Sequence, residues 1–232
     1  MQSPKVALLT LVVCFAGVFA TRTAWAQEAA TAERWASTRV TDPAQYGNIS
    51  RRGYAHREKA DFVMQELDVR PGDAVADIGA GDGFWTEKLA MAVGAEGVVY
   101  AGEIREDLVE RLKKRFSELP QVRAYLCPTD STGLEAQSCD LVFFSQVYHH
   151  LEEKKRVDYL RHLKEVVRPT GRLCVIERYP LLGGGSHGTQ LSQLFTEAEQ
   201  AGWVVARCQL IPGTDVFIAL FLKKELFRSG SR

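Results

Sequence analysis

The chain has 232 residues, of which 46% are hydrophobic and 25% are charged, a composition typical of one globular domain with a sizeable core. Its 29 basic residues balance its 29 acidic residues. No basic excess is therefore available to hold a phosphate backbone, which excludes a general nucleic-acid binder.

The first 26 residues form a segment of their own. Lys5 precedes an apolar run over residues 6–20, and Ala24-Trp25-Ala26 follows as an A-x-A cleavage pattern. The run is shorter than the roughly 20 residues that span a bilayer. We therefore expect a signal peptide over residues 1–26, cleavage before Gln27, an exported (periplasmic or secreted) protein and no stable membrane insertion afterwards. The alternative is an uncleaved signal that tethers the chain to the membrane.

The rest of the chain is predicted to divide into an N-terminal extension (residues 27–54), a folded domain (55–225) and a C-terminal tail (226–232). Apolar residues at helical spacing predict a helix over residues 56–69, which the Pro71-Gly72-Asp73 turn ends. Strands and helices then alternate. Strands are expected over residues 74–79, 97–104, 122–127, 140–147, 171–179, 203–211 and 216–224, and helices over residues 85–93, 105–119, 154–167 and 192–202.

This alternation predicts a parallel sheet with helices on both faces and right-handed crossovers. The last two strands are joined only by Pro212-Gly213-Thr214-Asp215, so they must run antiparallel. The sequence thus predicts an α/β fold with a doubly wound, Rossmann-like sheet, mostly parallel with an antiparallel C-terminal strand.

Three glycines follow the first predicted strand at every second position, in the stretch VADIGAGDGFWT. Gly79, Gly81 and Gly83 stand where the strand turns into a helix, and Asp77 lies two residues before the first of them. Doubly wound folds bind ligands at this end of their strands, where glycine lets a ligand approach the main chain and the helix offers unpaired N–H groups. A nicotinamide or flavin fingerprint would place its third glycine at position 84, which is Phe84 here.

The glycine motif resembles the nucleotide-binding motif of the class I S-adenosylmethionine-dependent methyltransferases, and the resemblance covers roughly residues 55–223. Glu103 ends the second predicted strand, where a carboxylate can accept hydrogen bonds from both ribose hydroxyls of a cofactor. The closing antiparallel hairpin is also similar to the final strand pair of that family. The resemblance implies the family's seven-stranded fold, S-adenosyl-L-methionine as the cofactor, and methyl transfer to a small-molecule acceptor by in-line displacement.

A closer resemblance is to small-molecule methyltransferases with a Tyr-His-His stretch after the fourth strand, here Tyr148-His149-His150. It implies a cofactor contact by Gln146, although those relatives usually carry asparagine there. It also implies a substrate contact by Arg57, in the helix before the first strand, and a catalytic histidine beyond the fifth strand, His187.

Two further residues belong to the predicted cofactor side. In the adenine loop, the acid usual in the family is replaced by Pro128, and Asp130 is expected to substitute for it. Asp77 is expected to position the cofactor, to hold the glycine turn by accepting backbone N–H bonds, or to do both.

The acceptor side is less determined. If the acceptor is a hydroxyl, amine or thiol, a base assists, and the candidates are His149, His150 and His187. If the acceptor atom is already nucleophilic, no base is required, because catalysis is then largely positional. Tyr148 and Glu177 are predicted to contact the substrate; the alternatives are that Tyr148 packs a helix onto the sheet and that Glu177 caps a loop.

The remaining histidines and cysteines suggest structural roles. His56 and His162 stand in charged helical stretches and are expected on solvated faces. Cys127 and Cys139 flank a loop and are candidates for a disulfide, but no C-x-x-C or zinc spacing is present, which favours buried thiols.

Two other functions share this fold. One is an exported S-adenosylmethionine-binding module without transferase activity, and the other is an NAD(P)-dependent oxidoreductase. The oligomeric state and the acceptor atom are left open by the sequence.

Overall fold

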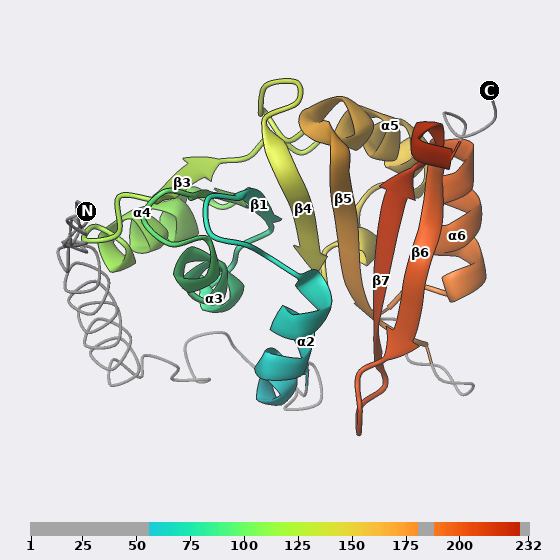
Figure 1. Cartoon of the computed structure of the whole chain (residues 1–232), viewed down its shortest axis with the longest axis horizontal. Coiled ribbons are helices and arrows are strands. Elements are labelled where there is room, and N and C mark those ends of the chain that lie inside the picture. Colours follow the sequence, from blue (N-terminus) through green and yellow to red (C-terminus); the bar gives the residue numbers. More distant parts are fainter. Residues whose placement is uncertain (1–55, 181–187, 228–232) are drawn as a thin grey trace, which may run out of the picture. The chain divides into compact units, whose positions relative to one another are not determined.

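The computed structural model describes residues 56–180 and 188–227. The strands are β1 (Ala74–Ile78), β2 (Val98–Glu103), β3 (Val122–Leu126), β4 (Cys139–Ser145), β5 (Val167–Arg178), β6 (Trp203–Leu210) and β7 (Val216–Lys223). They form one sheet in the order β3-β2-β1-β4-β5-β7-β6 (Figure 1). Strands β1 to β5 pair in parallel, whereas β7 runs antiparallel to β5 and β6. The predicted fold class is confirmed.

Helices follow most strands, as the sequence predicts. The α-helices are α2 (Ala60–Leu67), α3 (Phe84–Val93), α4 (Glu106–Arg115), α5 (Arg156–Val166) and α6 (Leu191–Gln200). Short 3-10 helices are η3 (Tyr148–His150), η4 (Glu153–Lys155) and η5 (Lys224–Phe227). The Tyr-His-His stretch therefore forms a turn of its own between β4 and α5.

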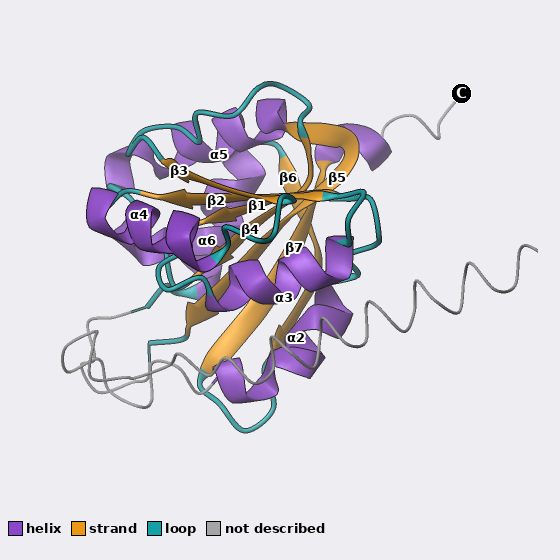
Figure 2. Ribbon diagram, turned by 90° about the vertical axis from the view of Figure 1, so that its left-hand side faces the viewer, coloured by secondary structure: helices purple, strands orange, loops and turns teal. Residues whose placement is uncertain are grey.

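Helices cover both faces of the sheet, because the strands send apolar side chains alternately to one face and to the other. In β4, Val142 and Phe144 pack with residues of α5 and α6, while Leu141 and Phe143 pack with residues of α2 and α3. Successive side chains of a strand point to opposite faces, so an unbroken apolar run indicates a strand buried on both sides. Figure 2 shows α3 and α2 on one side of the sheet and α5 on the other.

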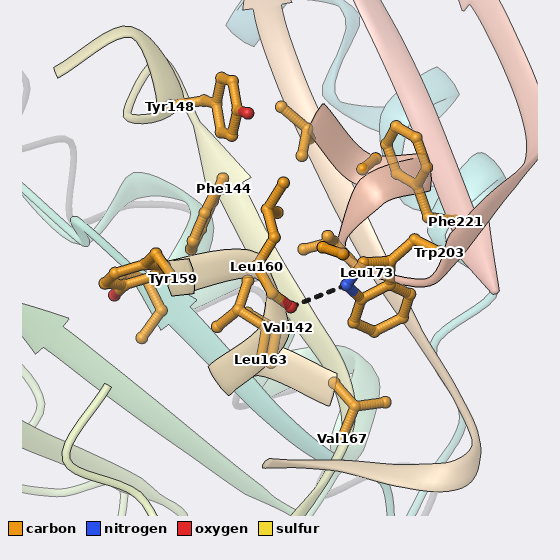
Figure 3. Packing of buried hydrophobic residues seen from close by; sticks show 14 of the residues in the cluster. Val142, Phe144, Tyr148, Tyr159, Leu160, Leu163, Val167, Leu173, Trp203 and Phe221 are labelled. Atoms are coloured by element: carbon orange, nitrogen blue, oxygen red, sulfur yellow. Dashed lines mark hydrogen bonds between the residues drawn. The ribbon is translucent and has the colours of Figure 1, made fainter. Parts of the chain in front are cut away.

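The α5/α6 face holds the larger aromatic side chains of the core. Figure 3 shows Tyr148, Phe144, Tyr159 and Trp203 in this cluster. Nε1 of Trp203 donates a hydrogen bond to the carbonyl oxygen of Leu160 at 2.8 Å, which satisfies the polar atom of a fully buried ring. This bond ties the start of β6 to α5.

The order of the strands decides where a ligand binds. The chain moves from β1 outward to β2 and β3 and then returns to β4 on the other side of β1. The loops after β1 and β4 therefore leave the sheet at its topological switch point, where open α/β sheets bind ligands. These two loops hold the glycine motif and the Tyr-His-His turn.

The four cysteines outside the predicted signal peptide are free thiols, so the disulfide alternative for Cys127 and Cys139 is wrong in this structure. Burial raises the pKa of each of these two thiols to about 11. The described residues include no helix long and apolar enough to cross a membrane. The predicted signal peptide, the whole N-terminal extension (residues 27–54) and His187 lie outside the described residues.

Candidate functional site

The three glycines all adopt left-handed backbone conformations, with φ of 75° at Gly79, 55° at Gly81 and 80° at Gly83. A Cβ atom at Gly79 would lie 2.4 Å from Cγ2 of Val147, and one at Gly83 would lie 2.7 Å from Cε2 of Phe116. At Gly81 the nearest atom would be the carbonyl oxygen of Gly79, 3.9 Å away. Two of the glycines therefore let the chain pack on itself, and Gly81 presents a bare main chain to open space.

The structure brings Glu103 to the glycine loop, as predicted. Its Oε2 accepts a hydrogen bond from the backbone N–H of Gly81, and its Oε1 accepts one from the N–H of Arg105, both at 3.0 Å. The side chain is 6% exposed. A carboxylate oxygen has more than one lone pair, so the carboxylate keeps capacity to accept bonds from a ligand at the loop.

Asp77 lies under the loop rather than at its surface. The residue is 2% exposed, and Oδ2 accepts a hydrogen bond from the hydroxyl of Thr86 at 2.6 Å. Burial raises the pKa of the Asp77 carboxyl to about 7, and the charges of Asp82 and Glu103 act in the same direction. Asp77 therefore ties the end of β1 to α3 and fixes the bend between them.

Arg57 binds the side chain of Asp82 in the glycine loop. Its guanidinium donates to both carboxylate oxygens of Asp82, at 2.6 and 3.0 Å, and lies 4.8 Å from the centre of the Phe84 ring. Oδ1 of Asp82 in turn accepts the N–H of Phe84 at 3.1 Å and so satisfies one of the unpaired N–H groups at the start of α3. Asp82 was missed by the sequence analysis, although an acid just before an apolar helical run is a helix-start signal.

The loop after β4 carries an unusual backbone at Gln146. Its φ is 60°, a conformation that costs free energy in a residue with a side chain and that gathers at functional sites. Its N–H donates to the carbonyl oxygen of Ile176 at 2.8 Å. Within the part of the chain that the structure describes, Nε2 of Gln146 is buried without a hydrogen-bond partner. A buried amide donor of this kind is suited to an acceptor atom of a ligand.

His149, in the η3 turn after β4, forms a pair with Glu177 at the end of β5. Nδ1 of His149 lies 2.8 Å from Oε2 of Glu177, and the backbone N–H of His149 donates to Oε1 at 3.3 Å. Glu177 is fully buried and both of its oxygens face His149, so its predicted contact with substrate gains no support here and stays a prediction. His150 is exposed, and its ring centre lies 4.0 Å from that of His149.

Tyr148 has a packing role. Its side chain is fully buried, and its hydroxyl donates a short hydrogen bond to Oε2 of Glu197 on α6. Burial raises the pKa of this phenol above its usual value, and the bond to Glu197 adds to the effect. These contacts favour the alternative that Tyr148 packs onto the sheet, and the predicted substrate contact of Tyr148 gains no support from them.

Two histidines expected on solvated faces are buried or bonded instead. His56 is 1% exposed; its Nε2 lies 3.1 Å from the Ser145 hydroxyl, and its ring stacks on Trp85 with centres 5.8 Å apart. Nε2 of His162 accepts the N–H of Thr132 at 3.0 Å. The charged neighbours of His56 and His162 in the sequence suggested exposed positions. Their partners Ser145 and Thr132 lie far away in the sequence, so the local pattern gave no sign of these contacts.

The predicted adenine loop follows β3. Asp130 is exposed on it, as is Pro128, and His162 holds the loop through Thr132. No described group contacts Asp130 in a way that tests its assignment, so it stays a prediction. Among residues 56–180 and 188–227, no cluster of His, Cys, Asp and Glu side chains could hold a metal ion.

A cavity of about 720 Å³ opens at the opposite edge of the sheet, where the parallel strands begin. Its charged side chains are engaged: Arg172 donates to the carbonyl oxygen of Leu67 at 2.6 Å, and Arg207 pairs with Glu66 at 2.5 Å. These contacts hold α2 against the sheet. Because the cavity lies at the far edge from the glycine loop and its charges are already paired, we place the functional site at the loops instead.

Residues 75–171 match the family model of a methyltransferase domain. The chain is 31% identical over 123 residues to an uncharacterized 37.1 kDa protein of transposon TN4556 from Streptomyces fradiae, an alignment covering 53% of this chain and 35% of that protein. It is 28% identical over 123 residues to a ubiquinone/menaquinone biosynthesis C-methyltransferase from Burkholderia mallei, covering 53% and 50%. The chain thus spans half the length or less of these curated relatives.

Solved structures share the fold. A SAM-dependent methyltransferase from Aquifex aeolicus is 24% identical with a TM-score of 0.62, covering 78% of this chain and 98% of that one. A 1,6-didemethyltoxoflavin-N1-methyltransferase from Burkholderia thailandensis, solved with 1,6-didemethyltoxoflavin and S-adenosylhomocysteine, is 18% identical with a TM-score of 0.60, covering 95% and 94%. Neither alternative function, the binding module or the oxidoreductase, finds support in these comparisons.

Proposed function

We propose that this chain, whose residues 75–171 match a methyltransferase domain, is an S-adenosylmethionine-dependent methyltransferase that acts on a small-molecule acceptor. The observation that carries the proposal is the bare main chain of Gly81 beside the carboxylate of Glu103, at the switch point of the sheet. The fold and the relatives with the same activity support it.

The residues at the loops fit the cofactor. Gly81 leaves room for a ligand against the main chain, Glu103 can accept bonds from ribose hydroxyls, and the buried Nε2 of Gln146 offers a donor. When bound, S-adenosylmethionine supplies a methyl group that its sulfonium makes electrophilic. The remaining work of the chain is to hold the acceptor in line with that methyl group and to exclude water.

The acceptor side is assigned to the loop after β4. Gln146 and His149 follow the strand that neighbours β1, and Val147 packs against Gly79 of the glycine loop. An acceptor bound beside residues 146–150 would therefore lie next to the cofactor loop. Arg57, for which the resemblance implies a substrate contact, bonds to Asp82 of the glycine loop, and its contact with substrate stays a prediction.

Calorimetric titration with S-adenosylmethionine, S-adenosylhomocysteine and NADH tests the cofactor. We expect binding of the first two in the micromolar range and no binding of NADH. Replacing Gly81 with valine should abolish binding by filling the open space. Gly213→Val is the matched control, because Gly213 also has a left-handed φ, of 77°, and open space around its Cα, but lies in the turn between β6 and β7. Binding that survives Gly81→Val, or binding of NADH alone, would contradict the proposal.

Transfer is tested separately, by measuring methyl release to a panel of small acceptors. Cofactor binding without any transfer would favour the binding module over the enzyme.

We also propose that the protein is exported. The proposal rests on the apolar run and the A-x-A pattern of residues 1–26. Cell fractionation and mass spectrometry of the mature N-terminus test it: a chain that begins at Gln27 is expected, and one that begins at Met1 would contradict cleavage.

A further inference from the structure

We propose that His149 is the general base of methyl transfer and that Glu177 is the residue that positions it, which makes the acceptor a molecule whose attacking oxygen or nitrogen carries a proton. The inference rests on the proposed function and narrows it. Three histidines were candidates from the sequence; the contacts of the described residues distinguish His149 from exposed His150.

The hydrogen bonds of Glu177 determine which ring nitrogen of His149 carries the proton. The backbone N–H of His149 can only donate, and it faces Oε1 of Glu177 at 3.3 Å. Nδ1 faces Oε2 at 2.8 Å, and an ionised carboxylate only accepts, so the proposal assigns the proton of the ring to Nδ1. In the neutral ring, the lone pair then lies on Nε2. This is the tautomer that a base needs when its orienting acid binds the other nitrogen.

The turn that carries His149 is held on several sides. Arg156 donates to the carbonyl oxygen of His149 at 3.3 Å, and the N–H of His150 donates to the carbonyl of Val147 at 2.9 Å. The Tyr148 hydroxyl is anchored to Glu197 on α6. A side chain whose backbone and ring are both fixed is preorganised, which is the property required of a catalytic group.

One carboxylate lies directly against the ring of His149. Within the described part of the chain, the charged or titratable groups seen to contact His149 include Glu177 on β5, His150 in the same turn and Arg156 on α5. Arg156 reaches the backbone carbonyl, whereas Glu177 reaches the ring itself. The buried carboxylate therefore stabilises the imidazolium that forms when the ring accepts a proton.

The step is balanced as follows. The acceptor oxygen or nitrogen gives its proton to Nε2 of His149 while its lone pair forms the new bond to the methyl carbon. The electron pair of the broken S–C bond stays on sulfur, which becomes a neutral thioether, and the proton passes from the imidazolium to solvent. No oxidant, reductant or metal enters the balance.

Glu177→Gln gives a test that needs no cofactor. Glutamine offers one acceptor and one donor, and the backbone N–H of His149 can use only the acceptor. The amide NH₂ must then face Nδ1, which forces the proton onto Nε2. Nitrogen NMR of histidine-labelled protein should show Nδ1 protonated in the wild type and Nε2 protonated in the variant, with the signal assigned by its loss in His149→Gln. An unchanged tautomer in Glu177→Gln would overturn the positioning role.

Activity gives the second test, with phenol, 4-nitrophenol, an alkylamine and pyridine as probes. We expect transfer to the hydroxyl or amine probes, and a loss of about 10²–10⁴-fold in kcat for phenol in His149→Gln. The loss should be much smaller for the more acidic 4-nitrophenol, and it should shrink as pH rises, because an acceptor already ionised by solvent needs no base. A merely structural role would lower both rates equally. Equal losses, transfer to pyridine alone, or no transfer to any hydroxyl or amine would overturn the inference.

The failure of this inference can be told apart from failure of the proposed function. If the wild type does not bind S-adenosylmethionine in the calorimeter, the proposed function fails, while the NMR result still decides the role of Glu177. If the cofactor binds and His149→Gln keeps full activity with phenol, only the base is wrong. Glu152→Gln is the control for the loss of one carboxylate, since Glu152 forms an exposed pair with Lys155.

Discussion

Arg57 grips Asp82 through two parallel hydrogen bonds, and so links the segment before α2 to the residue between Gly81 and Gly83. The side chains are 21% and 11% exposed, so this pair is shielded from solvent. Two-point binding of a carboxylate is specific to the planar guanidinium of arginine. The shape of the glycine loop thus depends on Arg57, which lies more than 20 positions upstream of it in the sequence.

Arg57→Lys should weaken cofactor binding about tenfold, because lysine keeps the charge but loses one of the two bonds and the contact with Phe84. Calorimetric titration with S-adenosylhomocysteine measures the change. Arg105→Lys is the control. Arg105 pairs with Asp107, and their side chains are 62% and 50% exposed, so this pair should contribute little. A direct substrate role for Arg57 would instead raise the KM of the acceptor and leave cofactor affinity unchanged.

Glu103→Gln should lower cofactor affinity by about 10 to 100-fold. The amide cannot accept hydrogen bonds on both arms, so the variant loses either the bond from Gly81 or the one from Arg105, together with the charge that favours ribose hydroxyls. The affinity for S-adenosylhomocysteine is the quantity to measure. Glu106→Gln, an exposed substitution at the start of α4, serves for comparison. Equal affinities in the two variants would remove Glu103 from the cofactor site.

The pH dependence of stability should reveal Asp77. Burial raises its pKa to about 7 from 3.8, so between these values the folded state holds a proton that the unfolded state has released. Stability contributed by the protonated form is therefore lost as pH rises through this window, by an amount on the order of a few kcal/mol at most. Asp77→Asn keeps an acceptor for Thr86 and does not titrate.

Urea unfolding at pH 5 and pH 8 measures this effect. The free energy of unfolding of the wild type should fall relative to that of Asp77→Asn as pH rises from 5 to 8. A difference between the two proteins that does not change with pH would show that Asp77 stays ionised when folded.

Patterns of neighbouring residues in the sequence were enough to predict the strands and the glycine bend after β1. The apolar runs gave the seven strands, and the spacing of Gly79, Gly81 and Gly83 indicated the bend after β1. The place of Glu103 beside the glycine loop was predictable because β2 is the next strand in the chain and also pairs with β1 in the sheet. One crossover therefore fixes its position relative to the glycines.

The pairing of His149 with Glu177 could not be predicted in this way. The two residues meet only because β5 lies next to β4 and because the η3 turn after β4 brings His149 to the end of β5. His56 shows the same limit: its neighbours along the chain are charged, but it is buried against Trp85 and Ser145, far away in the sequence. A helical pattern of apolar residues predicts which face of a helix is buried. It does not predict that a polar side chain such as His56 is buried by contacts with residues distant in the sequence.

The bond between Tyr148 and Glu197 yields a last prediction, about stability rather than chemistry. Tyr148→Phe keeps the ring in the core but leaves Glu197 with one described partner, Nε2 of Gln193 at 3.1 Å. Loss of a bond to a charged, partly buried acceptor should lower the free energy of unfolding by about 1–3 kcal/mol. Tyr159→Phe is the matched control, because its hydroxyl makes a longer, neutral bond of 3.3 Å to the carbonyl oxygen of Ser131, so we expect a loss of about 1 kcal/mol or less. Urea unfolding compares the two, and calorimetry should show unchanged affinity of both variants for S-adenosylhomocysteine. A Tyr148→Phe protein as stable as the wild type but inactive would return Tyr148 to the acceptor site.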